Sequence, residues 1–140
     1  MTRVLGIDLG DARIGLAISD ELGMLAHPLE TIRLKEIKDP HDHIARIIVR
    51  DGVTAVILGL PRNMDGTYGP AAAKARAFAD VLRTRINCPV HFWDERLTTV
   101  AAQRALHDAG RNTKQSRAVI DQVAAQLILQ GYLDSQATEG

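Results

Sequence analysis

The sequence predicts an α/β fold, a mixed five-stranded sheet with helices on both faces. Three short strand-like runs separated by turn residues open the chain, and strands then alternate with helices along the rest. The first pattern is typical of an antiparallel meander and the second of parallel strands joined by helices. A chain of 140 residues can also bury a sizeable core, roughly 70% of its unfolded surface.

The opening strand-like runs span residues 4–8, 14–19 and 25–32. Glycine and aspartate separate them at residues 10–11 and again at residues 20–23, and both residue types favour tight turns. Runs this close in sequence are expected to pair as neighbouring antiparallel strands.

A helix is predicted to begin at Asp39 and Pro40 and to end at Gly52. Aspartate caps the first turn of a helix, proline fits the first helical position, and glycine readily takes the left-handed conformation beyond the last turn. The apolar run that follows, residues 53–60, does not alternate with polar residues. It is typical of a parallel strand that is buried on both faces.

The second half continues this alternation of helices and strands. Pro70 opens a helix whose apolar residues keep helical spacing as far as Ile86, and residues 90–93 form the next strand. Two more helices are expected: one capped by Thr98 or Thr99 and ending before Gly110, the other beginning at Ser116 and ending near Gly131. Residues 1–140 are expected to form one domain, with residues 135–140 as a disordered tail.

Composition narrows the function classes. The 17 basic and 17 acidic side chains cancel, so any site for a polyanion must be local. No run is long and apolar enough for a membrane span, and no signal-peptide pattern appears, which predicts a soluble, cytoplasmic protein with no membrane partner. Cys88 is the only cysteine, so no internal disulfide is possible, and we expect it to be a small buried residue.

Three acidic residues are candidates for an active site. Asp8 ends the first strand, Glu95 follows the strand of residues 90–93, and Asp121 lies at the margin of the apolar face of the last helix. If the first strand is parallel to the later ones, their carboxyl ends meet at one sheet edge, where open α/β sheets bind ligands. Carboxylates there suit Mg²⁺ or Mn²⁺, which activate water for phosphodiester hydrolysis. Two structural alternatives stay open: a turn role for Asp8, and a solvated Asp121 paired with Arg117.

Basic residues near these acids are candidates for contacts with substrate phosphates. Arg62 lies in the loop GLPRNMDGTYG, which leads into a helix N-terminus at Pro70, where anions are favoured. The predicted substrate-binding residues are Arg62, Arg96, Arg111, Lys114 and Arg117. The alternative is that these residues belong to ordinary solvated loops.

The motifs GIDLGDARIG, GLPRNMDG, DERLTT and IDQVAAQLILQGYL follow one another over nearly the whole chain. In this order they resemble the YqgF family, also called RuvX, of ribonuclease H-like proteins linked to Holliday junction resolution and to maturation of precursor 16S ribosomal RNA. The resemblance implies a ribonuclease H-like fold with Asp8, Glu95 and Asp121 as the acidic active-site residues. Some related resolvases carry a further carboxylate one turn after the helix acid, where this chain has Ala124 and Ala125. The number of bound ions is therefore left open.

The residues and the resemblance together predict a metal-dependent endonuclease that uses Mg²⁺ or Mn²⁺. Its substrate is expected to be either a four-way DNA junction or the 5′ end of precursor 16S ribosomal RNA. Because a four-way junction has two-fold symmetry, paired cuts would suit a homodimer. Two alternatives remain: a ribosome- or junction-binding module that cleaves nothing, and a fragment of an actin-like ATPase, whose phosphate-binding hairpin the segment GIDLG also resembles.

Overall fold

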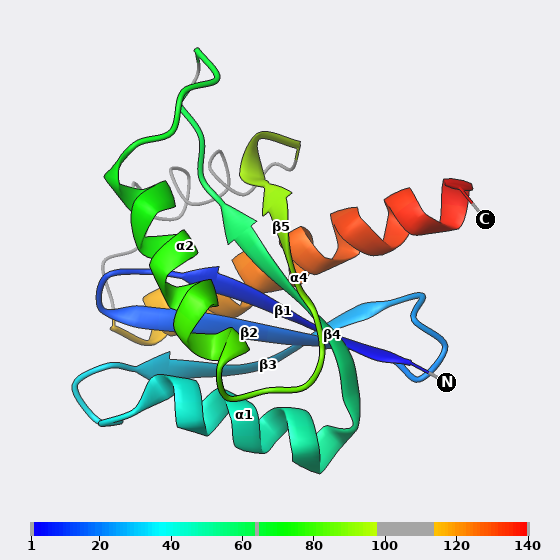
Figure 1. Cartoon of the computed structure of the whole chain (residues 1–140), viewed down its shortest axis with the longest axis horizontal. Helices are drawn as coiled ribbons and strands as arrows, with labels where there is room; N and C mark the ends of the chain where they lie inside the picture. The colour runs from blue at the N-terminus through cyan, green and yellow to red at the C-terminus, as the bar shows by residue number, and fades with distance from the viewer. Residues whose placement is uncertain (1, 64, 98–113, 140) are drawn as a thin grey trace.

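Five strands form one mixed sheet in the order β3-β2-β1-β4-β5 (Figure 1). A computed structural model describes residues 2–63, 65–97 and 114–139 of the chain. The strands are β1 Arg3–Leu9, β2 Arg13–Ser19, β3 Ala26–Arg33, β4 Val53–Leu60 and β5 Val90–Asp94. Strands β1, β2 and β3 pair antiparallel, whereas β4 pairs parallel with both β1 and β5. The predicted meander is confirmed, and so is the parallel arrangement of the first strand with the later ones.

Helices cover both faces of the sheet, as predicted (Figure 1). The described helices are α1 Pro40–Asp51, α2 Pro70–Arg83, the single 3₁₀ turn η1 Glu95–Leu97 and α4 Lys114–Glu139. Helices α1 and α2 share one buried apolar cluster with the sheet, and α4 shares another on the opposite face. The helix expected between residue 98 and Gly110 lies outside the described residues. No helix in the described ranges is both long and apolar enough to cross a membrane.

The ends of α1 confirm the capping signals in the sequence. Asp39 accepts a hydrogen bond from the backbone N–H of Asp42 at 3.1 Å, which satisfies a donor that the first helical turn leaves open. Gly52 has φ of 67°, a left-handed conformation, and its N–H donates to the carbonyl of Ile48. Glycine takes this conformation without the steric cost of a side chain.

Helix α4 is longer than the sequence predicted at both ends. It runs from Lys114 to Glu139 and includes Gly131, where we expected it to end, and residues 135–139, which we expected to be disordered. The side chain of Gln130 donates to the carbonyl of Met24 at 3.0 Å and accepts from the N–H of Ala26 at 2.9 Å. These contacts with the β2–β3 connection and the start of β3 hold the second half of the helix in place, and they outweigh the weak helix propensity of glycine.

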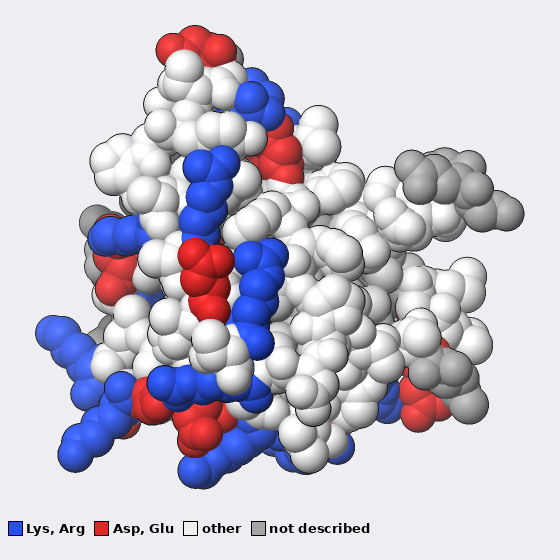
Figure 2. Space-filling model, in the orientation of Figure 1, with Lys and Arg blue, Asp and Glu red and all other residues white. Residues whose placement is uncertain are grey.

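Both signs of charge are mixed on the face that α1 and α2 cover (Figure 2). Within α1, Arg46 pairs with Asp42, and Arg83 of α2 pairs with Asp80. This pairing agrees with the zero net charge of the sequence.

Packing of α4 on β2 gives a first prediction. A Cβ atom at Gly15 would lie 1.9 Å from the backbone oxygen of Asp121, so Gly15→Ala must push the helix away. We expect a loss of about 3 kcal/mol in the free energy of unfolding, measured by urea denaturation. Gly52→Ala is the control because only its positive φ is strained and nothing lies within 4 Å of its Cβ. Its expected cost is about 1–2 kcal/mol, and an equal or smaller loss for Gly15→Ala would contradict the described packing.

Candidate active site

Asp8 lies at the carboxyl end of β1 and is only 1% exposed. Successive side chains of a strand alternate between the faces of the sheet. Val4 belongs to the apolar cluster beneath α4, and a Cβ at Gly6 would meet Leu129 of the same helix. Val4, Gly6 and Asp8 occupy alternate positions of β1, so the carboxylate of Asp8 is on the same face, which α4 covers.

Gly15 of β2 brings Asp121 close to Asp8. The antiparallel register places Gly15 directly opposite Asp8. Asp121 sits against this glycine, since a Cβ at Gly15 would lie 3.0 Å from the Cβ of Asp121. Only the missing side chain lets the backbone of α4 come this near the sheet. Asp121 is therefore positioned over Gly15, which lies directly beside Asp8 in the sheet.

Arg13 of β2 holds the carboxylate of Asp121. Its Nε donates to Oδ2 of Asp121 at 2.7 Å, and the two side chains are 25% and 12% exposed. The predicted alternative paired Asp121 with Arg117, whose side chain lies outside the described part of the structure. Sequence reasoning missed Arg13 as a site residue. The available signal was its place beside the glycines of GDARIG, in the same motif as Asp8.

Glu95 approaches from the other side, at the first residue after β5. A Cβ at Gly59 of β4 would lie 3.0 Å from Oε1 of Glu95 and 2.6 Å from Cδ1 of Ile128. The carboxylate is thus held over β4 beside α4. Burial raises the pKa of Glu95, and the negative charge of Asp94 raises this pKa further.

The three predicted acids therefore gather on one face of the sheet at the carboxyl ends of the central strands. The β1–β4 register pairs Ile7 with Leu58, so the next residues, Asp8 and Gly59, follow beside one another. Glycines flank Asp8 on both neighbouring strands, one covered by Asp121 and the other by Glu95. Asp8 and Asp121 are buried and Glu95 is partly buried. Such a clustering of shielded carboxylates, drawn from three elements far apart in sequence, is a feature of active sites.

The chemistry of these donors fits a divalent cation, because Mg²⁺ and Mn²⁺ prefer carboxylate oxygen. Among the described residues, however, no group of three or more His, Cys, Asp and Glu side chains is already drawn together as a ligand set. The contact between Arg13 and Asp121 accounts for part of this arrangement, because Oδ2 of Asp121 faces the guanidinium.

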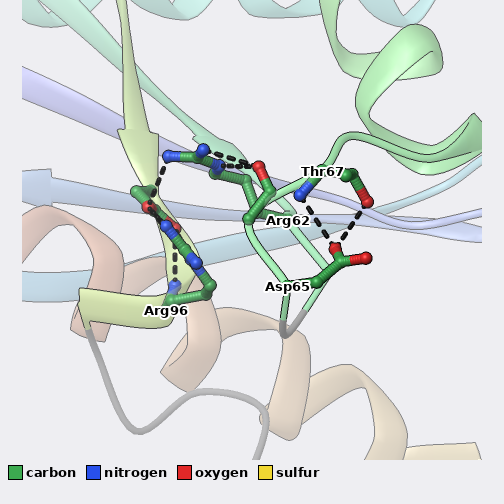
Figure 3. Close-up of polar contacts among 6 residues, drawn as sticks. Arg62, Asp65, Thr67 and Arg96 are labelled. Atoms are coloured by element: carbon green, nitrogen blue, oxygen red, sulfur yellow. Dashed lines mark hydrogen bonds and ion pairs between the residues drawn. The ribbon is translucent and has the colours of Figure 1, made fainter.

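Arg62 and Arg96 form a polar network beside Glu95 (Figure 3). Arg62 donates from Nε and Nη2 to the carbonyl of Gly66, at 3.1 and 2.6 Å, and its Nη1 lies 3.4 Å from Oδ2 of Asp94. Arg96 pairs with the same carboxylate at 3.0 Å. These contacts, led by the hydrogen bond from Arg96, lower the pKa of Asp94. Arg62 thus joins the loop at Gly66 to the end of β5, and Arg96 fixes the start of η1.

The network extends to an exposed aromatic ring. The guanidinium carbons of Arg62 and Arg76 lie 4.6 and 4.4 Å from the centroid of Tyr68. Both distances are within the range of cation–π attraction. Tyr68 therefore joins the loop to α2.

The other three predicted substrate-binding residues are outside what the structure describes. Arg111 lies outside the described residues, and so do the side chains of Lys114 and Arg117. Their role in binding substrate remains a prediction from the sequence.

A family model and several relatives of known sequence match nearly the whole chain. The family model for RuvX, described as Holliday junction resolvase, matches residues 2–135. Proteins named "Putative pre-16S rRNA nuclease" from Acetivibrio thermocellus and Moorella thermoacetica are 50% and 48% identical. The first match covers 96% of each chain, and the second covers 99% of each.

Solved structures of resolvases share the fold. Thermus thermophilus RuvC in complex with a Holliday junction substrate has a TM-score of 0.59 at 15% identity, over 97% of this chain and 96% of that one. The fowlpox virus Holliday junction resolvase has a TM-score of 0.56 at 16% identity, over 96% and 99% of the two chains. These likenesses confirm the predicted ribonuclease H-like fold.

Burial of Glu95 predicts that its charge destabilises the fold. Because the pKa of Glu95 is raised in the folded state, protonated Glu95 stabilises the fold at pH values below the ordinary glutamate pKa of about 4.3. This stabilisation is lost as the pH rises through the pKa that Glu95 has in the folded chain. Glu95→Gln should therefore unfold at higher urea than the native chain near neutral pH. The gain should shrink as the pH falls towards about 4. A gain that does not vary with pH would contradict this origin.

The ion pair of Arg13 and Asp121 predicts energetic coupling between two residues 108 positions apart in sequence. Arg13→Met, Asp121→Asn and the double variant form a double-mutant cycle for urea unfolding. We expect a coupling energy of about 1 kcal/mol, because the pair is largely removed from water. The same cycle on the exposed pair of Arg46 and Asp42 should give only about 0.3–0.5 kcal/mol. Equal coupling in the two cycles would show that Arg13 does not hold Asp121.

Proposed function

This chain belongs to the RuvX family of Holliday junction resolvases, and we propose that it is a metal-dependent endonuclease in which Asp8, Glu95 and Asp121 form the active site. The observation that carries the proposal is the gathering of these three acids around Gly15 and Gly59. Phosphodiester hydrolysis needs a positioned water and stabilisation of the leaving oxygen, and a bound Mg²⁺ or Mn²⁺ supplies both.

The roles proposed for the three acids follow from their places in the fold. Asp8 is fixed by the central strand and shielded from bulk water, so it is the least movable of the three. Asp121 and Glu95 approach from α4 and from the end of β5, on either side of Asp8. In this proposal all three carboxylates hold the cation, and Arg13 keeps Asp121 oriented towards the sheet.

The sequence predicted Arg62 and Arg96 as substrate-binding residues; because Asp94 engages both, this proposal gives them a positioning role. Their shared contact with Asp94 fixes the backbone from which Glu95 projects. Because two guanidinium groups already engage Asp94, the neighbouring Glu95 is the better candidate for binding the cation. Arg111, Lys114 and Arg117 are proposed to contact substrate phosphates at the start of α4.

Two structured nucleic acids are the candidate substrates. The family description names Holliday junctions, and the similar bacterial proteins are named for precursor 16S ribosomal RNA. Recognition of either through its shape and phosphates places few demands on individual side chains. For paired cuts across a four-way junction we propose a homodimer, whereas RNA trimming requires only one chain.

The proposal predicts loss of cleavage in Asp8→Asn. Labelled four-way junction, linear duplex and precursor 16S ribosomal RNA would be incubated with Mg²⁺, Mn²⁺ or EDTA. We expect cleavage of the junction or the RNA only with metal, and a rate at least about 100-fold lower in the variant, since an essential charge is lost.

Asp11→Asn is the matched control for this assay. Asp11 lies in the turn after β1, its side chain is 86% exposed, and it pairs with Lys74 rather than entering the acidic cluster. This variant should cleave at the native rate. Cleavage that persists in Asp8→Asn or in EDTA would overturn the proposal. Binding without cleavage by the folded native chain would instead indicate a binding module.

A further inference from the structure

Ion pairing among the described side chains leaves a distinct group of cations unmatched. The Lys and Arg side chains paired with carboxylates are Arg3, Arg13, Arg46, Arg50, Arg62, Lys74, Arg83, Arg85 and Arg96. Those without such a pair in the described ranges are Arg33, Lys35, Lys38 and Arg76. Arg76 lies against Tyr68, Arg33 is the last residue of β3, and Lys35 and Lys38 lie in the β3–α1 connection. Lys and Arg side chains protrude at the lower left of Figure 2, where Figure 1 shows this connection.

Arg33 lies at the end of the sheet where Asp8 and Glu95 are found. It ends β3 and lies directly opposite Arg13 in the antiparallel β2–β3 register. Directly opposed residues in such a pair share a face, so Arg33 is on the same face as Arg13 and the carboxylates. Like charges in these positions repel each other. Arg13 is compensated by Asp121, whereas Arg33 has no carboxylate partner among the described residues.

The connection after Arg33 is held in place by its backbone. The N–H of Leu34 donates to the carbonyl of Ala12 in the β1–β2 turn at 3.1 Å, and the N–H of Ile37 donates to the carbonyl of Arg33 at 3.2 Å. Leu34 and Ile37 also pack against the core beneath α1 and α2. Lys35 and Lys38 are exposed on this fixed segment.

Neighbouring carboxylates only partly offset these cations. Glu36 is exposed within the same turn and reduces the local positive charge by one. Asp39 is engaged by Arg85 and by the N–H of Asp42, and Asp42 pairs with Arg46. The segment therefore keeps an excess of positive charge at the sheet edge where Asp8 ends its strand.

We propose that Arg33, Lys35 and Lys38 form a phosphate-binding surface for the nucleic acid on the β3 side of the acidic site. This inference rests on the proposed function and adds a substrate contact that its acids do not provide. Neighbouring strands lie about 4.8 Å apart, so β3 is about 10 Å from β1. A polynucleotide strand seated over Asp8 would reach this surface with phosphates beyond the one being cleaved.

The test is the salt dependence of binding, measured by fluorescence anisotropy in EDTA so that no substrate is cleaved. The triple variant Arg33→Gln, Lys35→Gln, Lys38→Gln would be compared with the native chain on four-way junction and precursor ribosomal RNA. Each lost phosphate contact lowers the slope of log affinity against log salt by about 0.9 on duplex DNA and about 0.7 on single strands. We therefore expect the slope for the junction to fall by about 2 to 3.

A second triple variant, Arg3→Gln, Arg46→Gln, Arg50→Gln, removes the same formal charge from residues paired with acids elsewhere. It should bind with the native slope. If the native chain binds and the first variant keeps the native slope, or if both variants lose slope equally, the inference is overturned while the proposed function stands. If the native chain binds neither nucleic acid, the inference and the proposed function are both overturned. A reduced slope on only one of the two identifies the substrate that this surface contacts.

Discussion

Close approach of α4 to the sheet is the constraint on which the site depends. The helix lies against strand glycines, Gly6 and Gly15, and Ile128 of the same helix fills the space over Gly59. A side chain at any of these positions would occupy the space that now holds α4 or Glu95. Since Asp121 is carried by this helix, the helix–sheet distance also sets the distance between the helix acid and Asp8.

Gathering acids in this way has an electrostatic cost, and the chain offsets it with arginines. Asp121 faces Arg13, and Asp94 faces both Arg62 and Arg96. Glu95 bears the cost most directly, because burial and the charge of Asp94 both raise its pKa. Destabilisation of this kind at a candidate active site is an example of the trade-off between stability and function common to enzymes.

The arginines near the site thus divide into two kinds. Those engaged by carboxylates or carbonyls, such as Arg13 and Arg62, hold the acids and loops in position. Those left without such partners, such as Arg33, lie where a polyanion would meet the sheet edge. A chain with no net charge can in this way present a local positive surface to nucleic acid.

The sequence by itself determined the order of the elements, the caps of α1 at Asp39 and Gly52, and Asp8 as an acid at a strand end. These features depend on local periodicity and on residues with special backbone preferences, which a short segment expresses alone. Only the tertiary structure decided the length of α4, the partner of Asp121 and the position of the Glu95 side chain over Gly59. Each depends on contacts between segments far apart in the chain, as with Gln130 and Met24, and local propensity carries no information about them.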